Sequence, residues 1–340
     1  MMTAPVHVPP MAVGSDPEIL PLMFDLTLDQ VLLARIPLQT QAETSFLDER
    51  ALSPGVRTEW MAWPAFRDAA AKAPDPSLAY ILHVSHCGST LISRLVQMAS
   101  GARSLREPLP LRSFAIEAVQ SLDGGSFFTR QERVERIALF EKAWACGQTT
   151  VIKATSICND IADDLHPRAA LAFIYLKPQI FLANLLGRPQ AQADLRAYGQ
   201  LRLKRWNARS GWPQRMCDLK RGELAALCWL AEMTSIMAAQ RPVYTLDFDV
   251  FLTQPEERLL QLCESLNRPA TPAQASAAVA SPVMRHYSKN PSRAYDAATR
   301  AQILSQSQTI AADDIRDGMA WLNAAARNWK TAETALSRFG

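Results

Sequence analysis

The feature that most constrains the fold is an alternation of short apolar runs with helix-length segments, beginning near residue 78. The strand-like runs are residues 78–85, 149–153, 171–176 and 243–248. Apolar residues recur at helical spacing in the segments 89–99, 179–187 and 255–266. Strands that alternate with helices favour a parallel sheet covered by helices on both faces. We therefore predict an α/β fold.

The first 75 residues are predicted to form an arm and a helical cover. Residues 1–21 contain five prolines and no Lys or Arg, so we expect a loose arm and no signal peptide. The sequence LDQVLLARIP, residues 28–37, has the spacing of a short amphipathic helix that Pro37 ends. The rest of this part is expected to add helical or irregular cover, with a break at Pro64.

Two later segments are also predicted to be helical. Residues 223–240 are apolar and hold no Gly or Pro, so we expect a long helix in the core. Residues 297–336 are rich in alanine, which favours helix. The predicted organisation is thus a central α/β domain of residues 76–296, with a helical extension of residues 297–340 packed on it.

Composition is that of a folded protein without a membrane span. The chain has 340 residues, 48% of them hydrophobic and 20% charged, and no uninterrupted apolar run reaches the roughly 18 residues of a span. A net charge of +3 excludes neither anionic small molecules nor nucleic acid, and it is no nucleic-acid footprint by itself. We expect no nucleic-acid partner. The six cysteines form no CxxC pair and have no His partner at zinc spacing. We expect reduced thiols in a cytoplasmic protein, and no metal site.

The loop after the first strand-like run has the chemistry of an anion site. It reads HVSHCGSTLISRLV, residues 83–96, and Gly88 permits a tight turn. A loop that enters a helix directs backbone N–H groups and the helix dipole at one point, which suits phosphate or sulfate. Ser89 and Thr90 add hydroxyl donors, although they could equally cap an ordinary strand-to-helix turn. A nucleoside triphosphatase would carry lysine where Ser89 stands.

This loop resembles the 5′-phosphosulfate loop of the sulfotransferase family, above all bacterial sulfotransferase-like proteins whose loop reads Ser-Arg-Cys-Gly-Ser-Thr-Leu. Three later segments resemble the same group in the same order. They are SLREPL at 104–109, TLDFDVFLTQPEERLLQLCESLN at 245–267 and HYSKNPSRAYD at 286–296. The resemblance implies a P-loop NTPase-like fold that binds 3′-phosphoadenylyl sulfate (PAPS). It also implies transfer of the sulfuryl group, without a metal, to a hydroxyl or amine.

The resemblance assigns candidate roles to the loop and to the strand ends. The residues that would hold the 5′-phosphosulfate are Ser85, His86, Cys87, Gly88, Ser89, Thr90 and Leu91. His86 stands where the family has Lys or Arg, next to the bridging oxygen from which sulfate departs. Lys153 ends a strand and would point into the crevice at the carboxyl ends of the strands, although a solvated strand end is the alternative. The family's catalytic histidine is absent from the sequence after Lys153, and His166 is too far along to replace it.

Glu107 is therefore the candidate general base. A carboxylate in a cleft can take a hydroxyl proton, and Pro108 restricts the backbone beside it. Pairing of Glu107 with Arg103 or Arg106 is the structural alternative. Asp160 is a weaker candidate for the base.

The 3′-phosphate end of the nucleotide is assigned to residues farther along the chain. Lys177 and Asn184 stand near the family's positions for this phosphate, and Arg188 lies one turn beyond. Ser288 and Lys289 stand where the family closes a loop over the adenosine. Residues 194–215 carry six Arg or Lys with two interleaved tryptophans, and we expect a solvated helix followed by a lid near the acceptor.

Two other functions remain compatible with the sequence. The first is a P-loop nucleotide kinase or phosphotransferase, for which Asp247 and Asp249 are the nearest candidates to hold magnesium. The second is a catalytically silent nucleotide-binding scaffold, which His86 and the missing histidine would fit.

Overall fold

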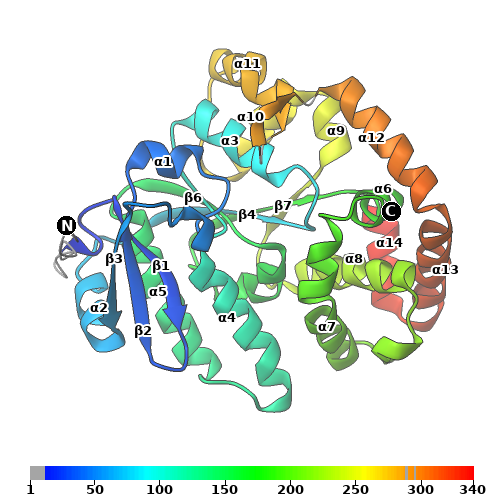
Figure 1. The fold of residues 1–340 in the computed structure, drawn as a ribbon, viewed down its shortest axis with the longest axis horizontal. Coiled ribbons are helices and arrows are strands. Elements are labelled where there is room, and N and C mark those ends of the chain that lie inside the picture. Colours follow the sequence, from blue (N-terminus) through cyan, green and yellow to red (C-terminus); the bar gives the residue numbers. More distant parts are fainter. Residues whose placement is uncertain (1–11, 288–289, 295) are drawn as a thin grey trace.

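A five-stranded parallel sheet lies at the centre of the protein (Figure 1). The computed structural model describes residues 12–287, 290–294 and 296–340. The strands are β4 (Ser77–His83), β5 (Arg103–Arg106), β6 (Thr149–Lys153), β7 (Ala170–Tyr175) and β8 (Val243–Asp247). Their order in space is β5-β6-β4-β7-β8, and every neighbouring pair is parallel. The predicted α/β fold is confirmed.

The strands form because their apolar runs can be buried on both faces of the sheet. In β4, all six residues from Leu78 to His83 are buried, and β6 is buried from Thr150 to Lys153. Continuous burial of this kind is typical of parallel strands covered by helices on both sides. The sequence identifies these strands for the same reason.

Helices cover both faces of the sheet. The helices up to the end of the sheet region are α1 (Leu38–Glu43), α2 (Trp63–Ala70), α3 (Ser89–Ser100), α4 (Leu109–Gln120), α5 (Arg130–Ala145), α6 (Pro178–Leu186), α7 (Gln192–Arg209), α8 (Arg221–Ala238), α9 (Phe248–Thr253), α10 (Pro255–Ser265) and α11 (Pro272–Ala280). The short 3-10 helices are η2 (Glu49–Ala51), η3 (Ser121–Asp123), η4 (Ser156–Asp164), η5 (Met216–Asp218) and η6 (Pro282–Arg285). Helices α3 and α10 pack on one face, and α5 and η4 pack on the other.

The predicted core helix and the helical C-terminal segment are both present. Helix α8 is buried along most of its length, and Trp229 donates its indole N–H to the carbonyl of Leu176 at 2.9 Å. A short hairpin, β9 (His286–Tyr287) and β10 (Asn290–Ala294), precedes the last helices. These are α12 (Ala297–Ile310), α13 (Ala312–Asn328) and α14 (Lys330–Phe339), of which α13 packs against α8.

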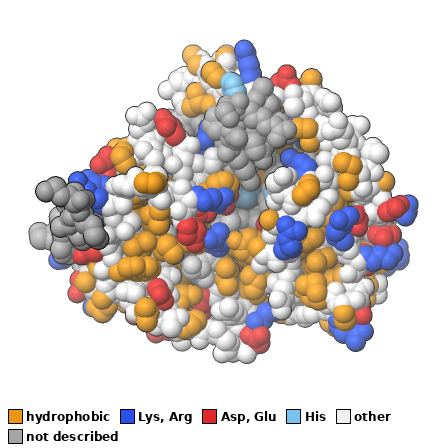
Figure 2. All heavy atoms as spheres, in the orientation of Figure 1, with side chains coloured by type: hydrophobic (Ala, Val, Ile, Leu, Met, Phe, Trp, Pro, Cys, Tyr) orange, Lys and Arg blue, Asp and Glu red, His pale blue; other side chains and the backbone are white. Residues whose placement is uncertain are grey.

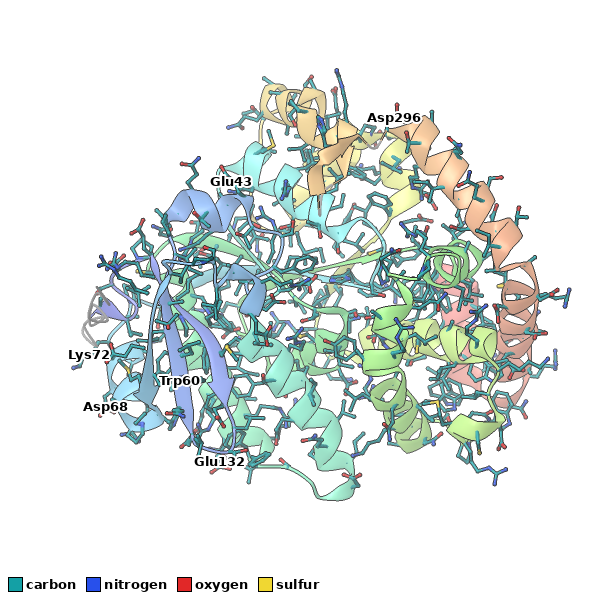
Figure 3. All side chains as sticks on the ribbon, viewed as in Figure 1. Glu43, Trp60, Asp68, Lys72, Glu132 and Asp296 are labelled. Atoms are coloured by element: carbon teal, nitrogen blue, oxygen red, sulfur yellow. The ribbon has the colours of Figure 1, made fainter. Side chains whose placement is uncertain are left out.

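The N-terminal part differs from the prediction of a helical cover. It contains an antiparallel sheet of β1 (Ile19–Asp25), β2 (Gln30–Arg35) and β3 (Arg57–Ala62), in that order. Trp60 lies on β3, the outer strand of this sheet (Figure 3). The predicted helix at 28–37 is wrong, because residues 30–35 form the strand β2. Val31 to Ala34 are all buried, so the side chains on both faces of this strand are covered. A short apolar run does not distinguish a helix from such a strand.

The segment between α1 and β3 is hydrogen-bonded to the chain at the C-terminal end of β5, the edge strand of the parallel sheet. Leu47 donates its backbone N–H to the carbonyl of Arg106 at 2.7 Å, and Leu109 N–H donates to the Leu47 carbonyl at 3.1 Å. The fully buried guanidinium of Arg106 donates to the carbonyls of Ala42 and Thr44, both at 2.9 Å. These bonds fix residues 44–51, called here the edge segment, beside the ends of the strands.

In the part of the chain that the structure describes, no helix is long and apolar enough to cross a membrane. All six cysteines are free thiols, and Cys87, Cys158, Cys228 and Cys263 are buried.

Candidate functional site

A cavity of about 490 Å³ opens at the carboxyl ends of the parallel strands. The chain passes from β4 to β5 on one side of β4 and from β6 to β7 toward the other, so the loop after β4 lies at a topological switch point. Ligands of open α/β sheets bind at such points. Figure 2 shows a hollow in this face of the molecule with Lys and Arg side chains around it. The charged residues and histidines that line the cavity are Arg50, His83, His86, Glu107, Arg112, Lys153, Arg188, Asp194, His286, Asp296 and Arg300.

The loop between β4 and α3 is held in an uncommon backbone conformation. Ser85, His86 and Gly88 have φ angles of 69°, 47° and 76°. Left-handed backbone costs a residue with a side chain about 1–2 kcal/mol, and such strain is found mainly at functional sites. A Cβ atom on Gly88 would overlap the ring of Phe248, so the loop has no room for another residue there.

The first turn of α3 presents hydroxyl groups to the cavity. Ser89 and Thr90 are buried and line the cavity, and no side chain caps the helix at Gly88. The Thr90 Oγ1 atom is buried and has no hydrogen-bond partner among the described residues. The unpaired N–H groups and positive end of a helix attract anions. The predicted loop residues from Ser85 to Leu91 all line the cavity at the N-terminus of α3.

Cys87 has a structural place in this loop. Its thiol is buried and donates to the Ile174 carbonyl at 3.3 Å. Burial raises the pKa of the Cys87 thiol to about 11. The neutral thiol therefore fills space beside β7.

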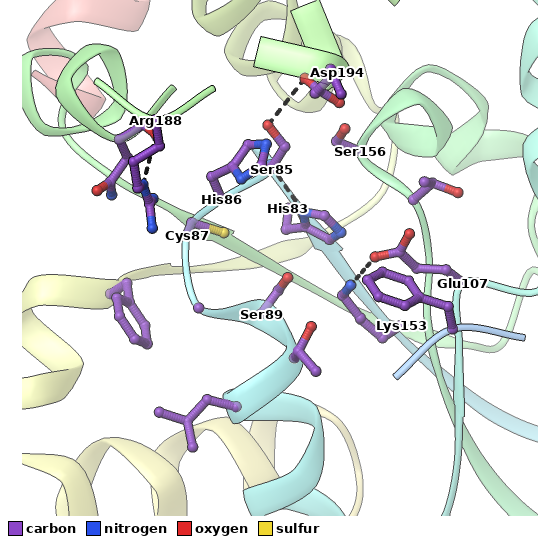
Figure 4. Close-up of a pocket in the computed structure, with 18 of the residues that line it drawn as sticks. His83, Ser85, His86, Cys87, Ser89, Glu107, Lys153, Ser156, Arg188 and Asp194 are labelled. Atoms are coloured by element: carbon purple, nitrogen blue, oxygen red, sulfur yellow. Dashed lines mark hydrogen bonds and ion pairs between the residues drawn. The ribbon is translucent and has the colours of Figure 1, made fainter. Parts of the chain in front are cut away.

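Lys153 and Glu107 form a buried ion pair in the cavity wall (Figure 4). The Lys153 side chain is 1% exposed, so the alternative of a solvated strand end is wrong. Glu107 has a φ of 55°, and its N–H donates to the Lys153 carbonyl at 2.6 Å. Arg103 and Arg106 are hydrogen-bonded to amide and carbonyl oxygens elsewhere, so the predicted alternative partners of Glu107 are wrong too. The two candidate catalytic residues thus lie in direct contact.

A buried hydrogen-bonded ring, called here the support ring, lies beneath the loop. Arg202 donates to Asp194 at 2.8 Å and to Glu232 at 2.6 Å. Asp194 accepts from the Ser85 hydroxyl at 3.4 Å. Asn159 donates to Glu232 at 2.9 Å and to the His83 carbonyl at 3.0 Å, which closes the ring. The support ring connects the start of the loop, at His83 and Ser85, to α7 and α8.

The predicted solvated helix at 194–215 is wrong for its inner face. Arg202 and Arg205 of α7 are each 1% exposed, and both donate to Glu232, at 2.6 and 2.7 Å. Charge pairing of this kind compensates part of the cost of burial. Asp160, the rival base, pairs with Arg209 at 2.5 Å and is not among the residues that line the cavity.

The residues assigned to the 3′-phosphate are only partly brought together. Asn184 of α6 and Arg188, which follows that helix, line the cavity, and the Arg188 Nε–H donates to the Asn184 carbonyl at 3.2 Å. Lys177 is exposed just before α6 and is not a lining residue. Ser288 and Lys289 lie outside the described residues.

Several lining residues on the α6 side were not predicted. Phe248, His286 and Arg300 come from α9, the hairpin and α12. Asp296 also lines the cavity, where it caps α12 by accepting from Thr299 N–H at 2.8 Å (Figure 3). Isolated residues of these types in polar segments carry no signal in one sequence.

The other wall of the cavity was also not predicted. Phe46 and Arg50 come from the edge segment, Arg112 from α4 and Tyr198 from α7. They meet only through tertiary packing. Among the described residues no group of three or more His, Cys, Asp and Glu could hold a metal ion.

The sequence matches no known protein family, and no curated protein is significantly similar to it. We therefore infer the function from the residues of the cavity.

Proposed function

We propose that this protein is a sulfotransferase that moves the sulfuryl group of PAPS to an acceptor hydroxyl or amine. The observation that carries the proposal is the buried Thr90 hydroxyl, which lies without a protein partner at the start of α3, inside a strained loop that contains no lysine. The loop suits a phosphate bound by backbone N–H and hydroxyl groups. The neighbouring strand β6 brings a buried cation, Lys153, into the wall of the same cavity.

The loop and strand residues would divide the work of transfer. Ser89, Thr90 and the N–H groups of α3 would bind the 5′-phosphate, while PAPS itself supplies an activated sulfuryl group. His86 and Lys153 would donate to the oxygen that gains charge as the bond to sulfur breaks. Preorganised donors at such an oxygen are among the largest contributions to catalysis.

Glu107 would receive the acceptor's proton. Its ion pair with Lys153 keeps the carboxylate next to the reacting atoms. The proton on the acceptor oxygen would pass to Glu107 as that oxygen bonds to sulfur. A general base within hydrogen-bond reach contributes about 10²–10⁴-fold.

Binding of adenosine 3′,5′-bisphosphate tests the proposal directly. We expect it to raise the melting temperature in the presence of a chelator, because ligands of the native state stabilise it. Thr90→Val should weaken this binding about tenfold, with Thr90→Ser as the control that keeps the hydroxyl. Because the Thr90 hydroxyl has no partner among the described residues, Thr90→Val should leave stability equal or slightly higher. Turnover of PAPS then measures the activity.

Other outcomes of the same panel would contradict the proposal. Stabilisation only by ATP with magnesium would favour a nucleotide kinase. That reading has less support, because Asp249 pairs with Arg300 and Asp247 caps α9. Binding of adenosine 3′,5′-bisphosphate without turnover of PAPS would leave a silent scaffold.

A further inference from the structure

The cavity has a second part on the Lys153 side of the loop. Its walls are Phe46, Arg50, Glu107, Arg112, Lys153 and Tyr198. Figure 4 shows Arg188 across the loop from Lys153 and Glu107. Under the proposed function, on which this assignment rests, the nucleoside would occupy the part of the cavity near Arg188. The second part would then hold the acceptor.

The two arginines of this wall are compensated very differently. Arg50 donates twice to Asp48, at 2.8 and 2.5 Å, and its guanidinium lies 3.5 Å from the centroid of the Phe46 ring. The Asp48 side chain is 4% exposed and that of Arg50 is 56% exposed, so the two short hydrogen bonds, and not burial of both partners, hold this pair. The charge of Arg50 is therefore largely neutralised within the protein.

Arg112 lacks such a partner. Among the described residues, the carboxylate within ion-pair distance of Arg112 is that of Glu49, at 3.9 Å, which is too far for a hydrogen bond. Glu49 is 57% exposed, so water screens the attraction, whereas Arg112 is only 22% exposed. Arg112 also contributes to lowering the pKa of Asp48, but that carboxylate is hydrogen-bonded to Arg50. The Tyr198 hydroxyl is a neutral neighbour, whose pKa burial raises and Arg112 lowers.

A largely buried guanidinium without a hydrogen-bonded anion favours an anionic ligand. Charge-assisted hydrogen bonds from arginine to a carboxylate are short and paired, and they compensate the loss of water around both groups. Phe46 and Tyr198 offer apolar surface for the body of the same ligand. Glu107 and Lys153 lie in the same wall, where the reacting hydroxyl would have to be.

We propose that the acceptor is a hydroxy acid whose carboxylate binds Arg112 and whose hydroxyl reaches Glu107. In the transfer, the hydroxyl oxygen forms the new bond to sulfur and the hydroxyl proton goes to Glu107. The bond between sulfur and the phosphate oxygen breaks, and its electron pair leaves with adenosine 3′,5′-bisphosphate. Arg112 takes no part in these bond changes and determines which acceptor binds.

The test compares acids with their neutral amides in the protein with and without saturating adenosine 3′,5′-bisphosphate. The probes are para-hydroxybenzoate against para-hydroxybenzamide and lactate against lactamide, measured by calorimetry. We expect at least one acid to bind about tenfold to a hundredfold more tightly than its amide, as hydrogen bonds to charged groups do. Arg112→Gln should bind the acid and its amide about equally, and Arg112→Lys should keep part of the preference for the acid.

Arg188→Gln is the matched control in the other part of the cavity. It should weaken binding of adenosine 3′,5′-bisphosphate and leave the preference for acids unchanged. Equal binding of acids and amides by the parent, or a preference that persists in Arg112→Gln, would overturn the proposed acid site. If adenosine 3′,5′-bisphosphate does not bind but the preference for acids still depends on Arg112, only the sulfotransferase proposal is refuted.

Discussion

Replacement of Arg202 by methionine should damage both stability and the nucleotide site. Arg202 is 1% exposed and donates to Glu232 at 2.6 Å, to Asp194 at 2.8 Å and to Ser156 at 2.8 Å. Removing one partner of a buried ion pair costs about 3–5 kcal/mol. Glu232 keeps its bond from Arg205 at 2.7 Å, so we expect the lower end, about 3 kcal/mol.

The same change should loosen the loop. Asp194 is the link between Arg202 and the Ser85 hydroxyl, and Ser85 is held at a φ of 69°. Without Arg202, the loop is free to relax from its strained conformation, and binding must then restore that conformation. A tenfold loss of affinity for adenosine 3′,5′-bisphosphate corresponds to about 1.4 kcal/mol, the size of one strained residue.

Arg133 provides a matched control far from the loop. It is 7% exposed and donates to Asp164 at 2.9 Å and to Glu117 at 3.1 Å. Asp164 keeps a second arginine, Arg130, at 2.8 Å, as Glu232 keeps Arg205. None of these control residues lines the cavity.

Urea unfolding and calorimetry with adenosine 3′,5′-bisphosphate measure the two effects separately. Arg133→Met should lose similar stability and bind the nucleotide like the parent. Equal affinity of folded Arg202→Met and Arg133→Met would refute the role of the support ring. If Arg202→Met does not fold, Asp194→Asn, which keeps the side-chain shape, should still lose affinity about threefold or more.

Three further predictions concern single residues. His86→Arg should keep turnover of PAPS and flatten its profile from acidic to neutral pH. His86→Ala should bind nucleotide and lose about a hundredfold in turnover, since the interaction forms mainly as charge develops; a His86→Ala variant as active as the parent would contradict this. Cys87→Ser should bind nucleotide within twofold of the parent, because the buried thiol, with its pKa raised to about 11, is neutral. Burial raises the pKa of Glu141 from 4.5 to about 7, so the folded protein holds a proton that the unfolded chain has lost. The free energy of unfolding should therefore fall as the pH rises from 4.5 to about 7. In urea unfolding, Glu141→Gln should make this fall smaller by up to about 3 kcal/mol.

The parallel sheet was predictable mainly through β4, β6 and β7, which are apolar runs buried on both faces. The edge strand β5 has the sequence RSLR and carries no such local signal. The run at 149–153 coincides with β6, and that at 171–176 is displaced from β7 by one residue. The N-terminal strand β2 was mistaken for a helix because its pattern is equally short and apolar. Only its pairing with β1 and β3 distinguishes the two, and pairing is not visible in a local window.

The candidate site was predictable where it is continuous in the sequence. The loop from Ser85 to Leu91 needs small residues and a glycine at fixed positions, which a local pattern reveals. The acceptor wall and the support ring escaped prediction because their members are far apart in sequence. In the sequence Arg112 and Arg202 look alike, because both are arginines in segments that fold as helices. Only the folded structure shows that Arg202 has a buried carboxylate partner and that Arg112 has none within ion-pair distance among the described residues.

The edge segment links protection of the sheet to the shape of the cavity. Leu47 pairs with the carbonyl of Arg106, the last residue of the edge strand β5, so that this group is not open to another chain. The adjacent Phe46 and nearby Arg50 are part of the cavity wall. Detachment of the edge segment would open the cavity wall and at the same time expose the outer edge of β5 at Arg106.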